Sequence, residues 1–209
     1  NHPNDKSTPY LEKIKKECKK MGIEVKVAYG DRLSLFKTIK SIKDIISQEK
    51  GNYIYVNVAS GSKIQAIAAM MACSLSKSSD NLKPFYAEPE SYAAFEGKQQ
   101  SFGIKDTIPL PLYAIHTPHP KLLAALKIVS EQPNQKITKK EMARIAEEQE
   151  IITVNAEQEN HSQARFASLE SNIIAPLEKE WKFVEVEKIG RNRWIKITQE
   201  GIDAAEFLI

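Results

Sequence analysis

The segment from Asn52 to Leu75 constrains the fold of this chain more than any other. Residues 53–58 are aromatic and β-branched, which predicts a central strand covered on both faces. Residues 64–75 carry Ile, Met and Leu at helical spacing with alanines between them, which predicts a helix packed on that strand. A turn between a strand and a helix points backbone N–H groups at solvent, at the positive end of the helix dipole. It therefore predicts a site for an anion, most often a phosphate.

The turn itself, residues 59–63, holds one glycine, two serines and one lysine. It lacks the spacing between glycines and the Gly-Lys-Ser/Thr ending of a P-loop, and its single glycine does not make a dinucleotide-binding fingerprint. Two interpretations therefore stay open, a phosphate site and an ordinary connection between a strand and a helix.

Helices and strands alternate through the first half of the chain, which predicts parallel strands joined by crossover helices. The last strand is expected at an edge, because Pro109 and Pro111 cannot donate to a ladder. The fold expected here is α/β, with a doubly wound, mostly parallel, Rossmann-like sheet. The expected helices start at Thr8 and after a cap at Asp31, and the expected strands cover residues 23–29, 53–58, 83–87 and 107–115.

Residues 88–106 show little periodicity and contain Tyr92, Phe95 and Phe102. A loop of this length inside a compact domain is usually functional or mobile. We expect either a lid whose aromatic rings stack on a base or a surface excursion anchored by those rings.

A boundary is expected at residues 116–120, His-Thr-Pro-His-Pro, where two prolines interrupt any helix. His116 and His119 lack a third ligand at matching spacing, so a linker is preferred to a metal site. The predicted domains are residues 1–115, a ligand-sensing and dimerisation domain, and residues 121–209.

The second half follows a different plan. Helices are expected over 121–130, after a capping box from Thr138 to Glu141, and after a cap at Ser162. Pro176 should kink or divide the third helix. Two strands, residues 183–187 and 193–197, then form a hairpin, and Thr198 opens a last helix. Three helices, a hairpin and a closing helix predict a winged helix-turn-helix domain.

In such a domain the third helix enters the major groove of DNA and the hairpin, or wing, lies along the backbone or minor groove. Polar side chains on the third helix and cations on the wing suit contacts with base edges and phosphates. The candidate DNA-binding residues are Gln163, Arg165, Ser168 and Asn172, with His161 beside them, and Lys188, Arg191 and Arg193 on the wing.

Charge argues against a simple DNA-binding assignment. From His116 onward the chain has 13 Lys and Arg against 15 Asp and Glu, a net charge of −2, whereas residues 1–115 have 17 against 12, a net charge of +5. DNA-binding domains are usually more basic than this. A winged helix used for dimerisation or protein contact stays an alternative.

Composition limits the class of protein. The 209 residues are 42% hydrophobic and 27% charged, with two cysteines on predicted apolar helix faces, which predicts reduced, buried thiols. No apolar run is long enough to span a bilayer and no signal peptide opens the chain, so we expect a cytoplasmic protein. The chain begins Asn-His-Pro, without methionine, which suggests a piece of a longer product.

The strand and turn Val56-Asn-Val-Ala-Ser-Gly-Ser-Lys63, the Ala/Ile/Met helix and the winged helix together resemble the CARF (CRISPR-associated Rossmann fold) transcriptional regulators of archaea. The resemblance covers essentially the whole chain. Its most specific part is the turn from Ser60 to Lys63, which looks like the family's Gly-Thr/Ser-Lys ligand motif. The family implies that further strands precede Asn1.

The resemblance implies a homodimer that binds a cyclic oligoadenylate across its two-fold axis and responds by changing its hold on operator double-stranded DNA. Gly61 and Ser62 would supply backbone N–H groups, Lys63 its charge and Ser60 a hydroxyl. Asn57 would orient the turn or touch a ribose. No other cofactor is expected.

Two further functions stay open. A ring nuclease that cleaves cyclic oligoadenylate would use Ser60, Ser62 and Lys63, but the turn lacks a general-base His or paired carboxylates, so catalytic residues are not assigned. A ligand-independent winged-helix repressor would leave the turn without a ligand.

Overall fold

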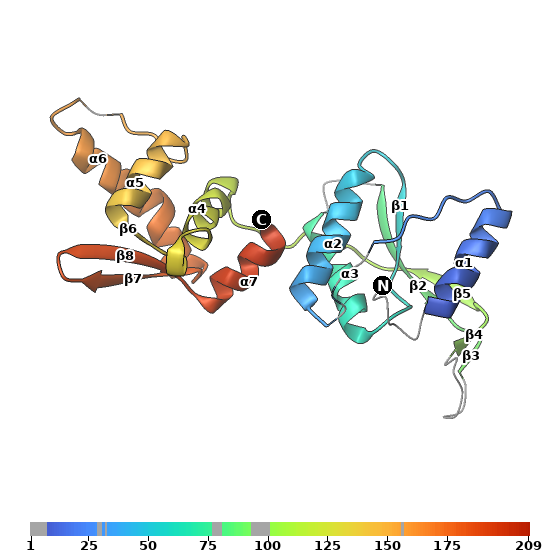
Figure 1. Cartoon of the computed structure of the whole chain (residues 1–209). Coiled ribbons are helices and arrows are strands. Elements are labelled where there is room, and N and C mark those ends of the chain that lie inside the picture. The colour runs from blue at the N-terminus through green and yellow to red at the C-terminus, as the bar shows by residue number, and fades with distance from the viewer. Residues whose placement is uncertain (1–7, 29–30, 32, 77–80, 93–100, 156) are drawn as a thin grey trace. The chain divides into compact units, whose positions relative to one another are not determined.

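The computed structural model describes residues 8–28, 31, 33–76, 81–92, 101–155 and 157–209. The chain divides into two compact units, Asn1–His116 and Thr117–Ile209, and each is described by itself (Figure 1). Within the described residues, no helix combines the length and the apolar character needed to cross a membrane.

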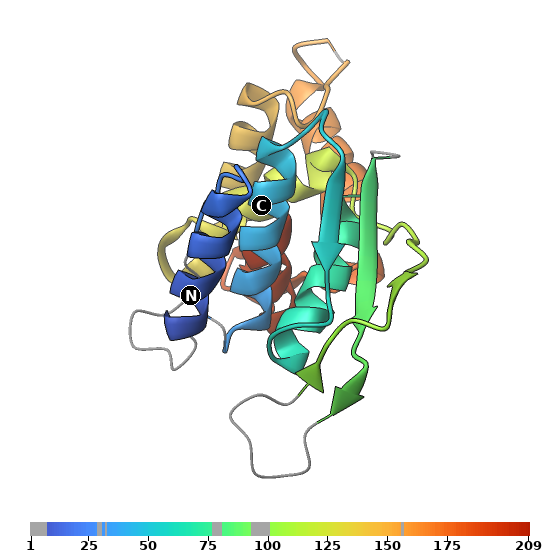
Figure 2. The same ribbon diagram turned by 90° about the vertical axis from the view of Figure 1, so that its right-hand side faces the viewer.

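The first unit contains a mixed sheet of three strands in the order β1-β2-β5. Strand β1 (Ile54–Asn57) is parallel to β2 (Leu82–Glu88), which is antiparallel to β5 (Asp106–Pro109). Helix α3 (Lys63–Leu75) follows β1 and packs against α2 (Leu35–Gln48) and β2 (Figure 2). The predicted strand, turn and helix are thus confirmed, as is the edge position of the last strand.

Two predictions about the strands are wrong. Residues 23–28 follow α1 (Thr8–Lys20) and the turn at Gly22 as irregular chain, because an alternating apolar pattern becomes a strand only where a ladder forms. Strand β1 therefore lies at the rim of the described sheet, not at its centre. It is also open on one face, since Tyr53 and Tyr55 are 70% and 64% exposed.

Two details of this unit also differ from the prediction. Helix α2 is capped by Ser34, whose hydroxyl accepts from the backbone N–H of Lys37, while Asp31 accepts from Leu33 in the turn before it. A short hairpin of β3 (Ser91–Tyr92) and β4 (Ser101–Phe102) occupies part of the stretch expected to lack regular structure. Phe95 lies outside the described residues.

The side chain of Cys73 is fully buried in α3, as predicted. Burial raises the pKa of its thiol to about 11, so this sulfur is a poor nucleophile at neutral pH. Cys18 on α1 is half-buried.

The second unit packs helices around an antiparallel sheet in the order β6-β8-β7 (Figure 1). One buried apolar cluster, with Leu126, Met142 and Leu169 among its most enclosed members, fills it. The sequence did not predict β6, which has only three residues. The elements are α4 (Pro120–Ser130), η1 (Pro133–Gln135), β6 (Lys136–Thr138), α5 (Lys139–Glu148), α6 (His161–Leu169), η2 (Glu170–Ile174), η3 (Pro176–Glu180), β7 (Val184–Ile189), β8 (Asn192–Ile197) and α7 (Gln199–Leu208).

Pro176 does not divide the third helix. The helical backbone continues from α6 through two π-helical stretches, η2 and η3, and the N–H of Trp181 donates to the carbonyl of Pro176, five residues earlier. Wider turns accommodate a proline that has no N–H to donate. The start of the helix also differs, because Asn160 and not Ser162 is its first flanking residue.

Candidate functional site

The turn after β1 is held by side chains within it. Asn57 accepts from the N–H of Ala59 through Oδ1 at 2.8 Å, and Gly61 has a φ of 94°. The Ser62 hydroxyl accepts from the N–H of Gln65 at 3.3 Å, and Gln65 Oε1 accepts from the N–H of Ser62 at 2.8 Å. This reciprocal pair is a capping box for α3. Asn57 orients the turn.

Gln65 is a functional candidate that the sequence analysis missed. Its side chain already binds the Ser62 N–H that was expected to meet a phosphate. It also covers Gly61, since a Cβ placed there would lie 2.6 Å from Gln65 Oε1. An anion bound to the Ser62 N–H would have to displace Gln65. The spacing Ser62-x-x-Gln65 is the sequence signature of a capping box and would have indicated this contact.

Ser60 and Lys63 are exposed on the same turn. Lys63 is the first residue of α3, where a cation opposes the helix dipole at a cost of about 0.3–1 kcal/mol. A bound anion would offset that repulsion, so the position of Lys63 is compatible with an anion site.

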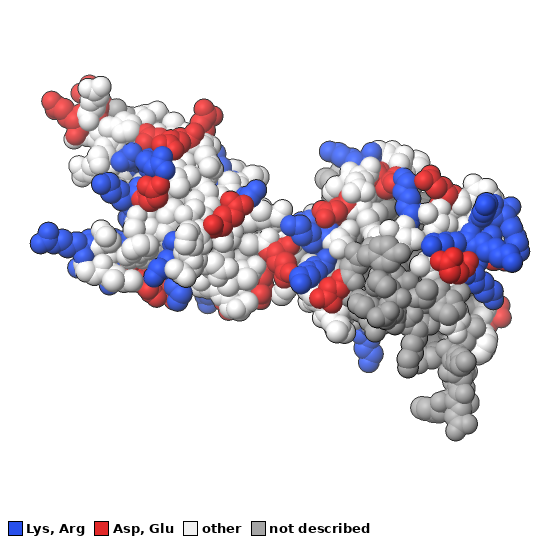
Figure 3. All heavy atoms as spheres, in the orientation of Figure 1, with Lys and Arg blue, Asp and Glu red and all other residues white. Residues whose placement is uncertain are grey.

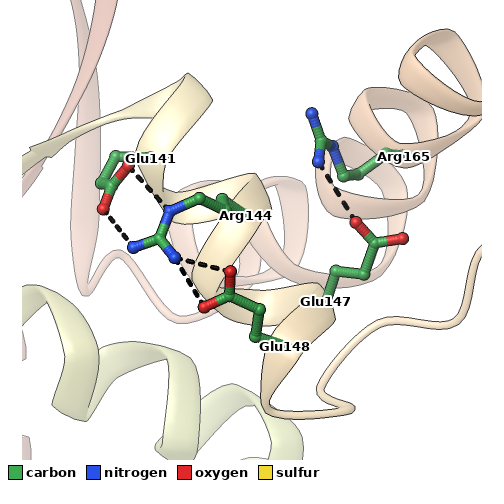
Figure 4. A network of polar contacts seen from close by, with 5 residues as sticks. All are labelled: Glu141, Arg144, Glu147, Glu148 and Arg165. Atoms are coloured by element: carbon green, nitrogen blue, oxygen red, sulfur yellow. Dashed lines mark hydrogen bonds and ion pairs between the residues drawn. The ribbon is translucent and has the colours of Figure 1, made fainter.

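The candidate residues on the third helix fall into two groups, exposed and internally paired, and Figure 4 shows one of the paired residues, Arg165. Gln163 is exposed, whereas Arg165 and Ser168 face α5 and the loop after it. Arg165 Nη1 lies 3.2 Å from Glu147 Oε2, and Ser168 donates to the carbonyl of Thr153. His161 contacts the other oxygen of Glu147 at 2.9 Å, and Asn172 donates to Ser168. Most of the helix residues expected to reach DNA therefore have partners within this domain.

Two of the three cations of α5, Lys139 and Arg144, are also paired. Arg144 Nη2 lies 2.6 Å from Glu141 and Arg144 Nη1 lies 2.5 Å from Glu148 (Figure 4). Hydrogen bonds from Arg144 hold the pKa of Glu141 below its usual range. Glu141 therefore does not complete the predicted capping box, although Thr138 accepts from its N–H. Lys139 is paired with Glu170.

The wing has a different charge arrangement. Lys188 lies opposite Arg193 in the β7–β8 ladder, and Arg191 follows Gly190 in the turn. All three cations are exposed, and none of them joins an ion pair within the described part of the domain. The wing carboxylates Glu185 and Glu187 are both held by Lys196. Figure 3 shows the resulting positive charge at the end of the hairpin.

The loop before α6 is acidic. Glu157 and Glu159 are exposed directly before the helix, where Figure 3 shows negative charge. Carboxylates at this position interact favourably with the positive end of the helix dipole, but they repel the phosphates of DNA.

His119 has a structural role, because its Nδ1 accepts from the N–H of Lys121 and caps α4. Across the described ranges, no three His, Cys, Asp or Glu side chains gather as metal ligands.

Family models match both units of the chain. Residues 1–92 match the family model described as HFX_2341_N:-like, N-terminal, and residues 121–209 match the DUF6293 C-terminal winged helix domain. Uncharacterized protein MJ1513 of Methanocaldococcus jannaschii is 24% identical over 173 residues, which cover 71% of this chain and 52% of that protein. The chain thus spans about half the length of this relative. It is a fusion of an N-terminal domain similar to the first family with a C-terminal winged helix domain.

Proposed function

We propose that this protein is a transcription regulator that binds operator double-stranded DNA through its winged helix domain. The observation that carries the proposal is the set of exposed wing cations that form no ion pair among the described residues, on a hairpin whose carboxylates, Glu185 and Glu187, both contact Lys196 instead. Mobile cations on a wing suit contact with the phosphate backbone.

We further propose that the N-terminal domain binds a cyclic oligoadenylate or a related nucleotide across a homodimer. The exposed turn from Ser60 to Lys63, at the carboxyl end of a parallel strand, supports this proposal, as does the cation at the first position of α3. Ligand binding would favour one arrangement of the two winged helices over another. Such coupling is typically worth about 1–3 kcal/mol.

The DNA proposal is tested by fluorescence anisotropy of a labelled duplex titrated at several salt concentrations. Replacing Lys188, Arg191 and Arg193 by alanine should weaken binding to every sequence. It should also reduce the salt slope by about 0.9 for each phosphate that the wing no longer neutralises. Lys127→Ala is the matched control, because Lys127 lies on α4 and is paired with Glu131. Equal salt slopes in the wing variant and the control would contradict the proposal.

The ligand proposal is tested by calorimetric titration with cyclic tetra-adenylate and cyclic hexa-adenylate. We expect saturable binding of one ring per dimer, weakened by roughly 1.5–3 kcal/mol in Lys63→Ala. Lys83→Ala, on β2, controls for the loss of a positive charge. The absence of heat with either ring would exclude a cyclic oligoadenylate as the ligand.

A second function, protein contact by the winged helix, is favoured by the pairing of Arg144 on α5 and Arg165 on α6 and by the acidic loop before α6. In that case the duplex titration would show no salt-dependent binding, and the wing variant would behave as the unmodified protein does.

A further inference from the structure

Glu147 on α5 is the acidic partner of two basic side chains on α6. Its two oxygens contact His161 Nε2 at 2.9 Å and Arg165 Nη1 at 3.2 Å, one oxygen for each. Figure 4 shows the carboxylate reaching from α5 to Arg165 on the facing helix. Both basic side chains lie in the first two turns of α6, the part of the helix that enters the groove in winged helix domains.

The Arg165 pair is incomplete. A guanidinium has five donors and prefers two parallel hydrogen bonds to a carboxylate or phosphate. Here a single ion-pair contact joins Arg165 to Glu147, and the buried Nε has no acceptor among the described residues. The Arg165 side chain is 22% exposed and that of Glu147 is 29% exposed, so the pair lies at the surface, within reach of another anion.

The pairing of Arg144 on α5 provides a contrast. Arg144 is held by Glu141 and Glu148, both from α5 itself, so this contact does not connect two helices. Glu147 differs because it contacts basic side chains of a neighbouring helix, α6.

We propose that Glu147 restrains DNA binding by holding Arg165 and His161 away from the phosphate backbone. A DNA phosphate must compete with this carboxylate, and it would offer Arg165 the second acceptor that Glu147 does not. This inference rests on the proposed DNA-binding function. It predicts that loss of an acidic side chain inside the domain strengthens DNA binding.

The test is a duplex titration of full-length Glu147→Gln at several salt concentrations. We expect binding roughly tenfold tighter at about 100 mM salt, with a salt slope steeper by about 0.9 when the Arg165 guanidinium contacts a phosphate. Gln matches Glu in size and removes the negative charge that attracts Arg165. Glu131→Gln is the matched control, since it makes the same charge change at a carboxylate paired with Lys127 on α4.

The double variant Glu147→Gln/Arg165→Gln tests whether Arg165 is the cation that makes Glu147→Gln bind DNA more tightly. If the released guanidinium binds phosphate, the double variant should lose most of the gain in affinity and in salt slope. A gain that persists in the double variant, or that equals the gain of Glu131→Gln, would overturn the restraint, because it would reflect net charge alone.

Thermal unfolding of each variant separates binding from folding. If the Glu147→Gln variant has the melting temperature of the unmodified protein but binds DNA no more tightly, the proposal that Glu147 restrains DNA binding is wrong. If the unmodified protein still binds through its wing cations in that experiment, the proposed function survives. If neither protein binds DNA at low salt, both the function and the restraint fail. Binding by Glu147→Gln alone would support the restraint most strongly.

Discussion

The two units of the chain differ in how completely they bury their apolar side chains. Twenty of the buried hydrophobic residues described lie in the winged helix unit, and eight lie in the α/β unit, three of which are alanines. The exposed large hydrophobic residues are distributed in the opposite way, sixteen in the α/β unit and two in the winged helix unit. The winged helix unit therefore buries most of its apolar side chains, whereas the described part of the α/β unit leaves many of its own exposed, as a surface that binds a partner does.

Truncation of a leucine to alanine in each unit should give the largest difference in the free energy of unfolding. Leu126→Ala, at a fully buried site in α4, should cost about 2–5 kcal/mol, whereas Leu33→Ala, at a site 79% exposed, should stay within about 0.5 kcal/mol. Both tryptophans, Trp181 and Trp194, belong to the winged helix unit, so their fluorescence during urea unfolding reports that unit alone. Circular dichroism reports both units, so the part of its change that fluorescence does not share follows the α/β unit. If both substitutions lowered the free energy of unfolding by the same amount, the contrast between the two units would be lost.

Glycines offer a second pair of substitutions. A Cβ at Gly201 on α7 would lie 2.1 Å from the carbonyl oxygen of Phe183, so Gly201→Ala should destabilise the winged helix unit by about 3 kcal/mol through overpacking. Gly51 has open space but a φ of 99°, so Gly51→Ala should cost only roughly 1 kcal/mol, from backbone strain. Thermal unfolding checks both. A Gly51→Ala variant as damaged as Gly201→Ala would mean that the α/β unit is also tightly packed there.

Removal of a helix cap should destabilise the two units by the same amount, because a cap is a local contact. Ser62→Ala and Thr138→Ala each remove a hydroxyl that accepts from the first turn of a helix, and each should cost about 1 kcal/mol. Urea unfolding followed by circular dichroism measures both transitions. Ser62→Gly, which should cost only a few tenths of that amount, is the control. A much larger cost for Ser62→Ala would show that the turn has tertiary contacts beyond its cap.

The smallest effect concerns acid stability of the winged helix unit. Arg144 lowers the pKa of Glu141 in the folded state, so the ion pair contributes stability above the pKa of the unfolded chain. That contribution is lost as the pH falls through the lowered folded pKa. Glu141→Gln should therefore flatten the decline of stability on the acid side, measured by tryptophan fluorescence from about pH 6 to about pH 3. An unchanged acid profile would show that this exposed pair has no effect on folding.

The elements that the sequence predicted well are those defined by local patterns. The strand, turn and helix around Gly61, the Thr138 cap of α5 and the Gly190 hairpin all depend on neighbouring residues. The strand expected over residues 23–29 failed and the three-residue β6 was missed, because ladder formation depends on chain segments far away in sequence.

The candidate sites show the same limit. Residue types on α6 follow from the sequence, but the assignment of Arg165 and Ser168 to internal partners depends on how α5 and the loop at Thr153 pack. Gln65 is an exception, because its spacing from Ser62 is a local signature. The wing cations, which need no tertiary partner to be exposed, were identified from the hairpin alone.

The position of β1 at the rim of the sheet has a consequence for handling the protein. Within the described residues one edge of β1 has no neighbouring strand, and its sequence, Ile-Tyr-Val-Asn, contains neither charge nor proline. Such an edge is a template onto which a strand from another molecule can add. In concentrated solution an uncovered β1 would seed intermolecular sheets, so light scattering that rises with protein concentration would be the first sign that this edge is bare.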